Sequence, residues 1–184
     1  GSCCYEDAEW TQLGQTITGE ALSDFSGWSL SLNNDGTIVA IGAPYSDGEL
    51  DYGQVRVYEN IDENWIQIGQ DINGDSYNDW FGSVVCLNSS GNRIAIGTGY
   101  ADNGNEYGNN TGHVKIYEYD GLSWNQLGLD IEGNEFNDNF GTALSFSADG
   151  AVVAIGAPQS GSELGYVSIF YYDEDNNSWI QIGN

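Results

Sequence analysis

The side chains best suited to chemistry in this sequence are carboxylates and amides at alternate positions of two related loops. They are Asp71, Asn73, Asp75 and Asp79 in one loop, and Asp130, Glu132, Asn134 and Asp138 in the other. Calcium takes about six to eight oxygen ligands, and oxygen atoms at this spacing can surround one ion. The sequence therefore allows a calcium ion at each loop, although no motif requires a cofactor.

A second interpretation of these loops needs no metal. The equivalent stretch near the start of the chain has Thr16 and Thr18 in place of two ligands. In this interpretation a glycine makes a turn, and the last aspartate of the loop accepts hydrogen bonds from nearby backbone amides. The residues concerned are Gly19 with Asp24, Gly74 with Asp79, and Gly133 with Asp138.

The sequence lacks the groups that common hydrolases and transferases use. His113 is the single histidine, and Gln54 and Tyr166 occupy its position in the related stretches, so an imidazole is not needed there. There is no glycine-rich phosphate loop and no CxxC pair for zinc. We therefore expect a protein that is not an enzyme.

The charge balance excludes one class of partner. The chain has 28 acidic residues against three permanent cations, Arg56, Arg93 and Lys115, and its net charge is −25. Nothing in such a chain can neutralise the phosphates of a nucleic acid. No apolar run approaches the roughly 20 residues of a membrane helix. We therefore expect neither nucleic-acid binding nor membrane insertion.

The elements that must position these side chains repeat along the sequence. The motif W-x-Q-[IL]-G occurs four times, beginning at Trp10, Trp65, Trp124 and Trp179. The first three copies are 55 and 59 residues apart, and each is followed by a stretch similar to "DWFGSVVCLNSSGNRIAIGTG". A period of this size is typical of stacked or radial arrays, in which we expect the tryptophans to pack between neighbouring units.

Each repeat has the pattern of four short antiparallel strands. In the first repeat "WSLSL" alternates, "NNDG" is a turn signal, "TIVAIGA" is almost wholly apolar, and "GQVRVYE" alternates with Val55 and Val57 inward. The next "WIQIG" supplies the fourth strand. The sequence thus predicts an all-β fold of three four-stranded antiparallel units, each the size of one propeller blade.

Two short signals recur at the same phase of successive repeats. They are Phe-Gly at Phe81-Gly82 and Phe140-Gly141, and Gly-Ala-Pro at Gly42-Ala43-Pro44 and Gly156-Ala157-Pro158. From Trp10 onward the chain resembles the FG-GAP repeats of integrin-alpha-like β-propellers. The resemblance implies an extracellular or cell-surface propeller that serves adhesion or ligand binding and not catalysis. That family often binds calcium between its first two strands, where "NNDG", "NSSG" and "SADG" are too short here.

The repeat boundaries divide the chain into an N-terminal segment, a surplus strand and three blades. Residues 1–9 form the segment, 10–18 the surplus strand, and 19–69, 70–128 and 129–184 the blades. The strand is surplus because each blade already has its own copy of the motif. An unpaired strand is a template for pairing with another chain. The expected assembly residues are Cys3, Cys4, Trp10, Gln12, Leu13 and Ile17.

Glycans and cysteines fit a secreted chain. Three sequons begin at Asn88, Asn109 and Asn176, all in expected turns or loops where a glycan could be attached. The chain has no methionine, as expected of a processed secreted form. Three cysteines allow at most one disulfide within the chain, so Cys3 or Cys4 links either to Cys86 or to another chain. Without such a link Cys86 is a small buried side chain.

Two function hypotheses remain open. One is a non-catalytic structural protein whose copies share the surplus strand and form a filament or ring, because three blades do not close a ring of about four to eight. The other is a binding fragment of a larger propeller that contacts a protein or glycan ligand, with help from calcium. Trp28 and Trp80 could then stack on a sugar ring, although core packing is the simpler role for both.

Overall fold

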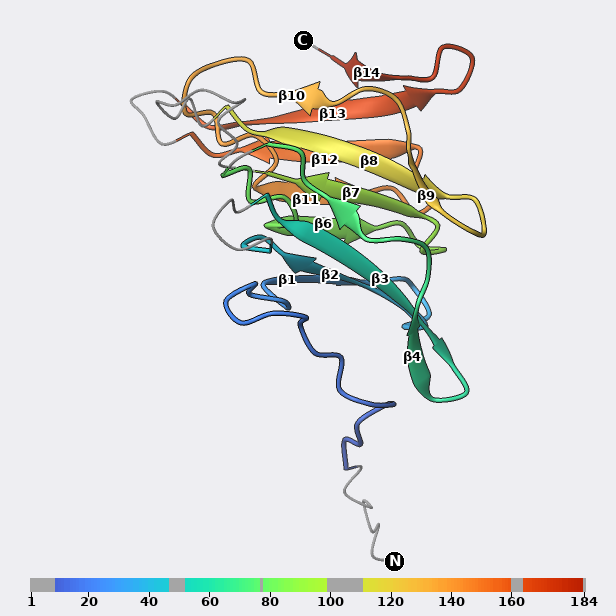
Figure 1. Cartoon of the computed structure of the whole chain (residues 1–184). Helices are drawn as coiled ribbons and strands as arrows, with labels where there is room; N and C mark the ends of the chain where they lie inside the picture. The colour runs from blue at the N-terminus through green and yellow to red at the C-terminus, as the bar shows by residue number, and fades with distance from the viewer. Residues whose placement is uncertain (1–8, 47–51, 77, 99–110, 160–163, 184) are drawn as a thin grey trace, which may run out of the picture.

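The computed structural model describes residues 9–46, 52–76, 78–98, 111–159 and 164–183. These residues form an all-β structure in which three antiparallel sheets follow one another in chain order. The sheets lie in a stack, with the first sheet and the N-terminus at one end and the third sheet and the C-terminus at the other (Figure 1). In the part of the chain described, no helix is long and apolar enough to cross a membrane.

Each sheet is a meander of neighbouring strands. The first contains β1 (Ser29–Leu32), β2 (Ile38–Ala43), β3 (Gln54–Ile61), β4 (Asn64–Gln67) and β5 (Ile72–Asn73). The second contains β6 (Val84–Leu87), β7 (Arg93–Gly97), β8 (His113–Tyr119), β9 (Trp124–Gln126) and β10 (Ile131–Glu132). The third contains β11 (Ala143–Phe146), β12 (Val152–Ala157), β13 (Tyr166–Asp173) and β14 (Ser178–Ile182). The predicted all-β class and antiparallel pairing are confirmed.

The outer strand of the first two sheets is interrupted, which differs from the four continuous strands we expected. β3 pairs with β4 through residues 58–61 and with β5 through Gln54 and Val55. Between β4 and β5 lies Gly69, whose φ of 72° is in the left-handed region that favours glycine. The second sheet repeats this arrangement with β9 and β10 on β8. The fourth strand is therefore two short pieces joined by a bulge.

The hydrophobic core lies between neighbouring sheets. One cluster joins Ala40, Val55, Val57 and Ile72 of the first sheet to Phe81, Val85, Leu87, Ile94, Ile96 and Trp124 of the second repeat. The other joins Ala95, Val114, Ile116 and Ile131 of the second sheet to Phe140, Val153, Ile155 and Ala157 of the third repeat. Val55 and Val57 point inward as predicted. The second sheet buries both of its faces in this way.

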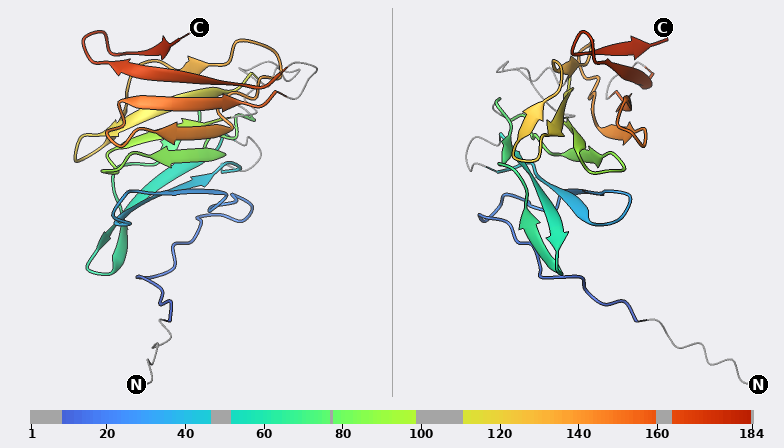
Figure 2. Two further views of the ribbon diagram at one scale, coloured as in Figure 1. Left: turned by 180° about the vertical axis from the view of Figure 1, so that it is seen from behind. Right: turned by 90° about the vertical axis from the view of Figure 1, so that its right-hand side faces the viewer.

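Residues 10–18 do not form the predicted strand within this chain. Residues 9–28 contain no strand, and the segment leads away from the stack as an extended trace (Figure 2). A strand is stable only when a neighbour accepts its backbone hydrogen bonds. Among the described residues no sheet precedes the first one, so the segment has no ladder to join.

Candidate functional site: the two open faces of the stack

Each sheet turns one face toward the sheet before it in the chain and the other toward the sheet after it. We call the first its front face and the second its rear face. In the described structure no other sheet covers the front face of the first sheet or the rear face of the third sheet (Figure 2). The segment before β1 reaches part of the front face, where Glu20 forms an ion pair with Arg56 at 3.2 Å. These two faces, at opposite ends of the stack, are the candidate site.

The front face of the first sheet exposes apolar side chains that the other repeats bury. Leu30 and Leu32 on β1 are 63% and 58% exposed. Their counterparts on β6, Val85 and Leu87, are each 7% exposed because they pack against the first sheet. The first sheet thus has an apolar surface of the kind that the second sheet uses to bind its neighbour.

The rear face of the third sheet shows the complementary pattern. Val167 and Ile169 on β13 are 67% and 41% exposed. The counterparts on β8 are Val114 and Ile116, which are buried at 0% and 1% exposure between the second and third sheets. The two open faces are therefore the two halves of an interface that the chain makes twice within itself.

Two glycine pairs bring the backbones of neighbouring sheets into contact. In each pair, an added Cβ on the first glycine would overlap the carbonyl oxygen of the second; the pairs are Gly42 with Gly82 and Gly97 with Gly141. The counterparts at the open faces are Gly156 and Gly27. Gly27 has no atom within 4 Å of an added Cβ, and the nearest atoms to Gly156 belong to Ala143 of the same sheet.

A series of backbone hydrogen bonds joins the turns of successive sheets. The amide of Asn34 donates to the carbonyl of Ser89, and the amide of Ser89 donates to the carbonyl of Ala148, both at 3.0 Å. A side chain adds to the first interface, where Ser31 Oγ accepts from the amide of Leu87 at 2.9 Å. The series ends at Asn34 on one open face and at Ala148 on the other.

The repeated tryptophans bind each sheet to the chain before it. Each indole Nε1 donates to the carbonyl of the Leu or Ile of the preceding motif; the pairs are Trp65 with Leu13, Trp124 with Ile68, and Trp179 with Leu127, at 2.9–3.0 Å. Gln15 and Gln70 each exchange two hydrogen bonds with the backbone of the next tryptophan. The predicted packing of these tryptophans between units is confirmed for Trp124, which is buried in the first core cluster.

The segment 10–18 already has the local bonding of an outer strand. Gln12 Nε2 donates to Thr16 Oγ1 at 3.2 Å, and the equivalent glutamines, Gln67 and Gln126, donate to the aspartates four residues on. Of the predicted assembly residues, Trp10 is fully exposed, Leu13 binds Trp65, and Ile17 is half-buried. Cys3 and Cys4 lie outside the described residues.

The first predicted calcium loop is occupied by protein hydrogen bonds. Asp71 accepts from Gln54 and Gln67, and Asn73 Oδ1 accepts from Gln54. Asp75 forms an ion pair with Lys115 at 2.6 Å. Asp79, the fourth predicted ligand, is fully buried. Within the described ranges no group of three or more His, Cys, Asp or Glu side chains is placed to hold a metal, and calcium here stays a prediction.

The second predicted calcium loop is arranged in the same way. Asp130 lies 3.3 Å from the ammonium of Lys115, Glu132 is exposed, and the amide of Asn134 donates to Asp138. Asp138 Oδ2 also accepts from the hydroxyl of Tyr166 at 2.6 Å. Asp138 therefore accepts from a nearby backbone amide, as the metal-free interpretation predicts. Asp24 does the same, because it accepts from the amides of residues 20, 21 and 26.

The expected exposure of Asn88 is wrong. Its side chain is 3% exposed, and its amide nitrogen donates to Asn92 and to the carbonyl of Asp149 in the next sheet. A buried and bonded amide cannot receive a glycan in the folded chain. Asn176 is exposed as expected, and Asn109 lies outside the described residues. Cys86 is a half-buried free thiol whose pKa is raised by burial.

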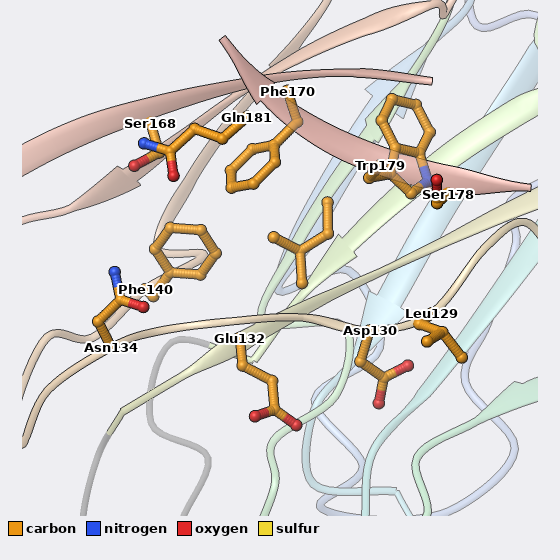
Figure 3. A pocket seen from close by; sticks show the side chains of 11 residues that line it. Leu129, Asp130, Glu132, Asn134, Phe140, Ser168, Phe170, Ser178, Trp179 and Gln181 are labelled. Atoms are coloured by element: carbon orange, nitrogen blue, oxygen red, sulfur yellow. The ribbon is translucent and has the colours of Figure 1, made fainter. Parts of the chain in front are cut away.

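A cavity of about 330 Å³ lies between β10 and the third sheet (Figure 3). Phe140, Phe170 and Trp179 face it, whereas the carboxylates of Asp130 and Glu132 point away from it (Figure 3). Its remaining lining residues are Leu129, Ile131, Asn134, Ser168, Ser178 and Gln181. Ser168 lines the cavity with a short side chain at the register position where the other sheets have Arg56 and Lys115.

A second feature is a group of aromatic rings on the loops beside β1, β2 and β6. Tyr45 lies 4.9 Å from Phe25 and 5.2 Å from Trp80 between ring centroids, and Trp28 lies 6.0 Å from Phe25. Phe25 and Trp80 occupy the same repeat position and have φ of 54° and 50°, which is unusual for bulky residues. Phe25 and Trp28 are more than half exposed.

Sequence reasoning missed the residues that define the open faces. Gly27, Gly156 and Ser168 carry no motif of their own. A position-by-position comparison of the repeats would have found Ser168, because it is the one neutral residue at the position of Arg56 and Lys115. Gly27 and Gly156 were visible as repeat glycines, but only the sheet stacking shows that their counterparts touch.

Comparisons with known proteins support the fold alone. No family model matches the chain, and no curated protein matches it. Among solved structures, a candidate 6-phosphogluconolactonase from Bacteroides uniformis is 11% identical with a TM-score of 0.54, over 84% of this chain and 39% of that one. Sqt1 from Saccharomyces cerevisiae is 14% identical with a TM-score of 0.53, over 86% and 35%. The chain is therefore β-propeller-like, and it spans less than two fifths of either structure.

Proposed function

We propose that this chain is a non-catalytic structural protein whose copies stack end to end, the third sheet of one copy on the first sheet of the next. The three sheets are then three FG-GAP-like blades of an extracellular or cell-surface assembly. The observation that supports this function is that the open front face and the open rear face carry the same repeat positions as the two internal interfaces.

Specific contacts define the proposed interface. Gly156 of one copy would lie against the carbonyl of Gly27 of the next, as Gly42 does against Gly82. Leu30 and Leu32 would be covered by Val167 and Ile169, and burying one such side chain is worth about 1.5–3 kcal/mol before the cost of association. The faces differ from each other, so the contact is heterologous and builds either a ring or an open filament.

A second candidate function is ligand binding by a larger propeller of which this chain is a part. The exposed aromatic group at Phe25, Trp28 and Tyr45 favours it, because aromatic faces beside polar loops can stack on sugar rings. The matched structures are also more than twice as long as the matched region. Under this function the open faces are covered by further blades, and a protein or glycan is the ligand.

The test of the proposed function is the size of the particles that the purified chain forms. Mass photometry and negative-stain electron microscopy over a range of concentrations should show rings or filaments. The Leu30→Glu variant should fold normally, because residue 30 is exposed in the single chain. It should not assemble, because residue 30 lies inside the proposed interface. Monomers at every concentration, combined with Trp28-dependent binding on a glycan array, would support the second function instead.

A further inference from the structure

One half of β13 has an uncovered edge in the third sheet. In the first sheet Val55 pairs with Ile72 of β5, and in the second sheet Val114 pairs with Ile131 of β10. The counterpart on β13 is Val167, and the described structure pairs it with β12 alone. Exposed strand edges of this kind accept another strand. The cavity of Figure 3 lies beside this edge, between Ser168 and β10.

The segment 10–18 carries the residue that this edge lacks. Ile17 follows its motif tryptophan by seven residues, as Ile72 and Ile131 do. The segment also has the bonds of an outer strand already formed, because Gln12 donates to Thr16 and the Leu13 carbonyl accepts from Trp65. Because these contacts are in place before pairing, less conformational entropy is lost when the segment binds an edge.

The neutral side chain of Ser168 at the cavity suits the neutral Thr16 of this segment, and not the aspartates at the same position of the other outer strands. In the second sheet the cation Lys115 lies 3.3 Å from Asp130, which precedes Ile131. In the third sheet the same pair of positions would hold Ser168 and Thr16, which are both neutral. Ser168 is buried at 8% exposure and lines the cavity. The hydroxyl of Thr16 would be able to hydrogen-bond to the hydroxyl of Ser168, whereas a carboxylate there would have no cation beside it.

We propose that residues 10–18 of one copy exchange for β14 of another copy and become the outer strand of its third sheet. Trp10 to Gln12 would pair where Trp179 to Gln181 pair now, so β14 must leave. Ile17 and Thr18 would then cover Val167 and Tyr166, which β14 does not reach. This inference rests on the proposed end-to-end function, and it names the strand that joins two copies.

The exchange would preserve the contacts between sheets. The indole of Trp179 donates to the carbonyl of Leu127, and the indole of Trp10 could take over this bond in the other copy. Leu13 and Gln15 would keep their bonds to Trp65 of their own chain. These bonds would hold the first sheet of the donor copy to the strand that this copy donates. Within one chain the segment and the third sheet lie at opposite ends of the stack (Figure 1), so the donor must be another copy.

Cross-linking between two different full-length variants tests this strand exchange. One carries Thr16→Cys and the other Ser168→Cys, both with the three native cysteines changed to Ser, which is the residue at the equivalents of Cys86. The mixture is treated with a short bis-maleimide and separated under denaturing conditions. Thr11→Cys replaces Thr16→Cys as the control, since the exchanged register would place residue 11 opposite Tyr171, roughly 10 Å from Ser168 by strand rise.

We expect about tenfold more heterodimer from the Thr16→Cys mixture than from the Thr11→Cys mixture. Assemblies that form normally without this preference would overturn the exchange while leaving end-to-end stacking intact. Monomers at every concentration would overturn both. A second measurement uses charge: Ser168→Lys should weaken assembly about tenfold, and Thr16→Asp in the partner should restore it, as Asp130 serves Lys115. Failure of this rescue, with both variants folded, would count against the proposed register.

Discussion

The imidazole Nε2 of His113 lies 3.6 Å from Oδ2 of Asp79, and both side chains are buried between the loop before β6 and the start of β8. Burial, followed by the nearby ammonium of Lys115, lowers the pKa of His113 from 6.5 to about 4. The carboxylates of Asp75 and Asp130 act in the opposite direction but do not restore the ordinary value. At neutral pH the contact therefore joins a neutral imidazole to Asp79.

This relationship predicts a loss of stability in mild acid. Between pH 6.5 and about 4 the unfolded chain holds a proton on His113 that the folded chain does not, so the free energy of unfolding falls as the pH falls through this window. The loss is on the order of 3 kcal/mol, at about 1.4 kcal/mol per pKa unit. Urea titrations at pH 4, 5, 6 and 7 measure it. His113→Gln should flatten the slope, and an unchanged slope would assign it to other groups.

Two equivalent glycines should respond differently to the same substitution. Gly97→Ala should lower the free energy of unfolding by about 1–3 kcal/mol, because its Cβ would overlap the carbonyl of Gly141. Gly156→Ala should cost less than about 1 kcal/mol, since only Ala143 of the same sheet lies near. Thermal melts measure both. The Gly156→Ala variant should nevertheless stay monomeric at concentrations where the unmodified chain assembles, and assembly by this variant would contradict the proposed interface.

Two tryptophans of the motif should have different roles, Trp124 in the stability of the monomer and Trp10 in the assembly of copies. Trp124→Phe removes the donor to the Ile68 carbonyl inside the core and should cost about 1–3 kcal/mol in the single chain. Trp10→Phe should leave the monomer unchanged, because Trp10 is fully exposed, but should weaken assembly. Chemical denaturation of each monomer and mass photometry separate the two effects. Equal destabilisation of the monomer by both variants would mean that Trp10 has a folded-state contact.

Assembly should strengthen with added salt. Each copy carries a net charge of −25, so copies repel one another until salt shortens the screening length to about 8 Å at physiological ionic strength. Light scattering against sodium chloride concentration measures this dependence. A parallel series with calcium chloride at matched ionic strength tests the two predicted loops. If calcium binds there, it should promote assembly beyond its ionic-strength effect, and a chelator should reverse the difference.

The sequence predicted the strands well because their periodicity is local. Alternation in "WSLSL" and "GQVRVYE" and the turn at "NNDG" correspond to β1, β3 and the turn between β1 and β2. The interruption of the outer strand was not predictable, since the motif glycine that makes the bulge looks like the end of a strand. The burial of Asn88 was also missed, because Asn88 donates to the carbonyl of Asp149, which is 61 positions away in the sequence.

The candidate site was predictable only in part. The repeated motif singled out residues 10–18 as a surplus strand, but it did not indicate that this segment lacks strand structure in the described chain. Asp75, one of the carboxylates that indicated calcium, forms an ion pair with Lys115 of the next sheet. This pairing depends on which sheets lie side by side, and a local pattern of acidic residues carries no information about that. The bond from the Asn134 amide to Asp138 is local, and the metal-free interpretation predicted it.

The unlike ends of the stack give any assembly built from it a direction. One terminus of a growing particle would always present the apolar face of Leu30 and Leu32, and the other would always present Gly156 and β13. Addition at the two termini would then proceed at different rates, as in other polar polymers. A copy without residues 1–18 could still receive a strand but not donate one, so a small fraction of such copies would act as chain terminators and set the length of the particle.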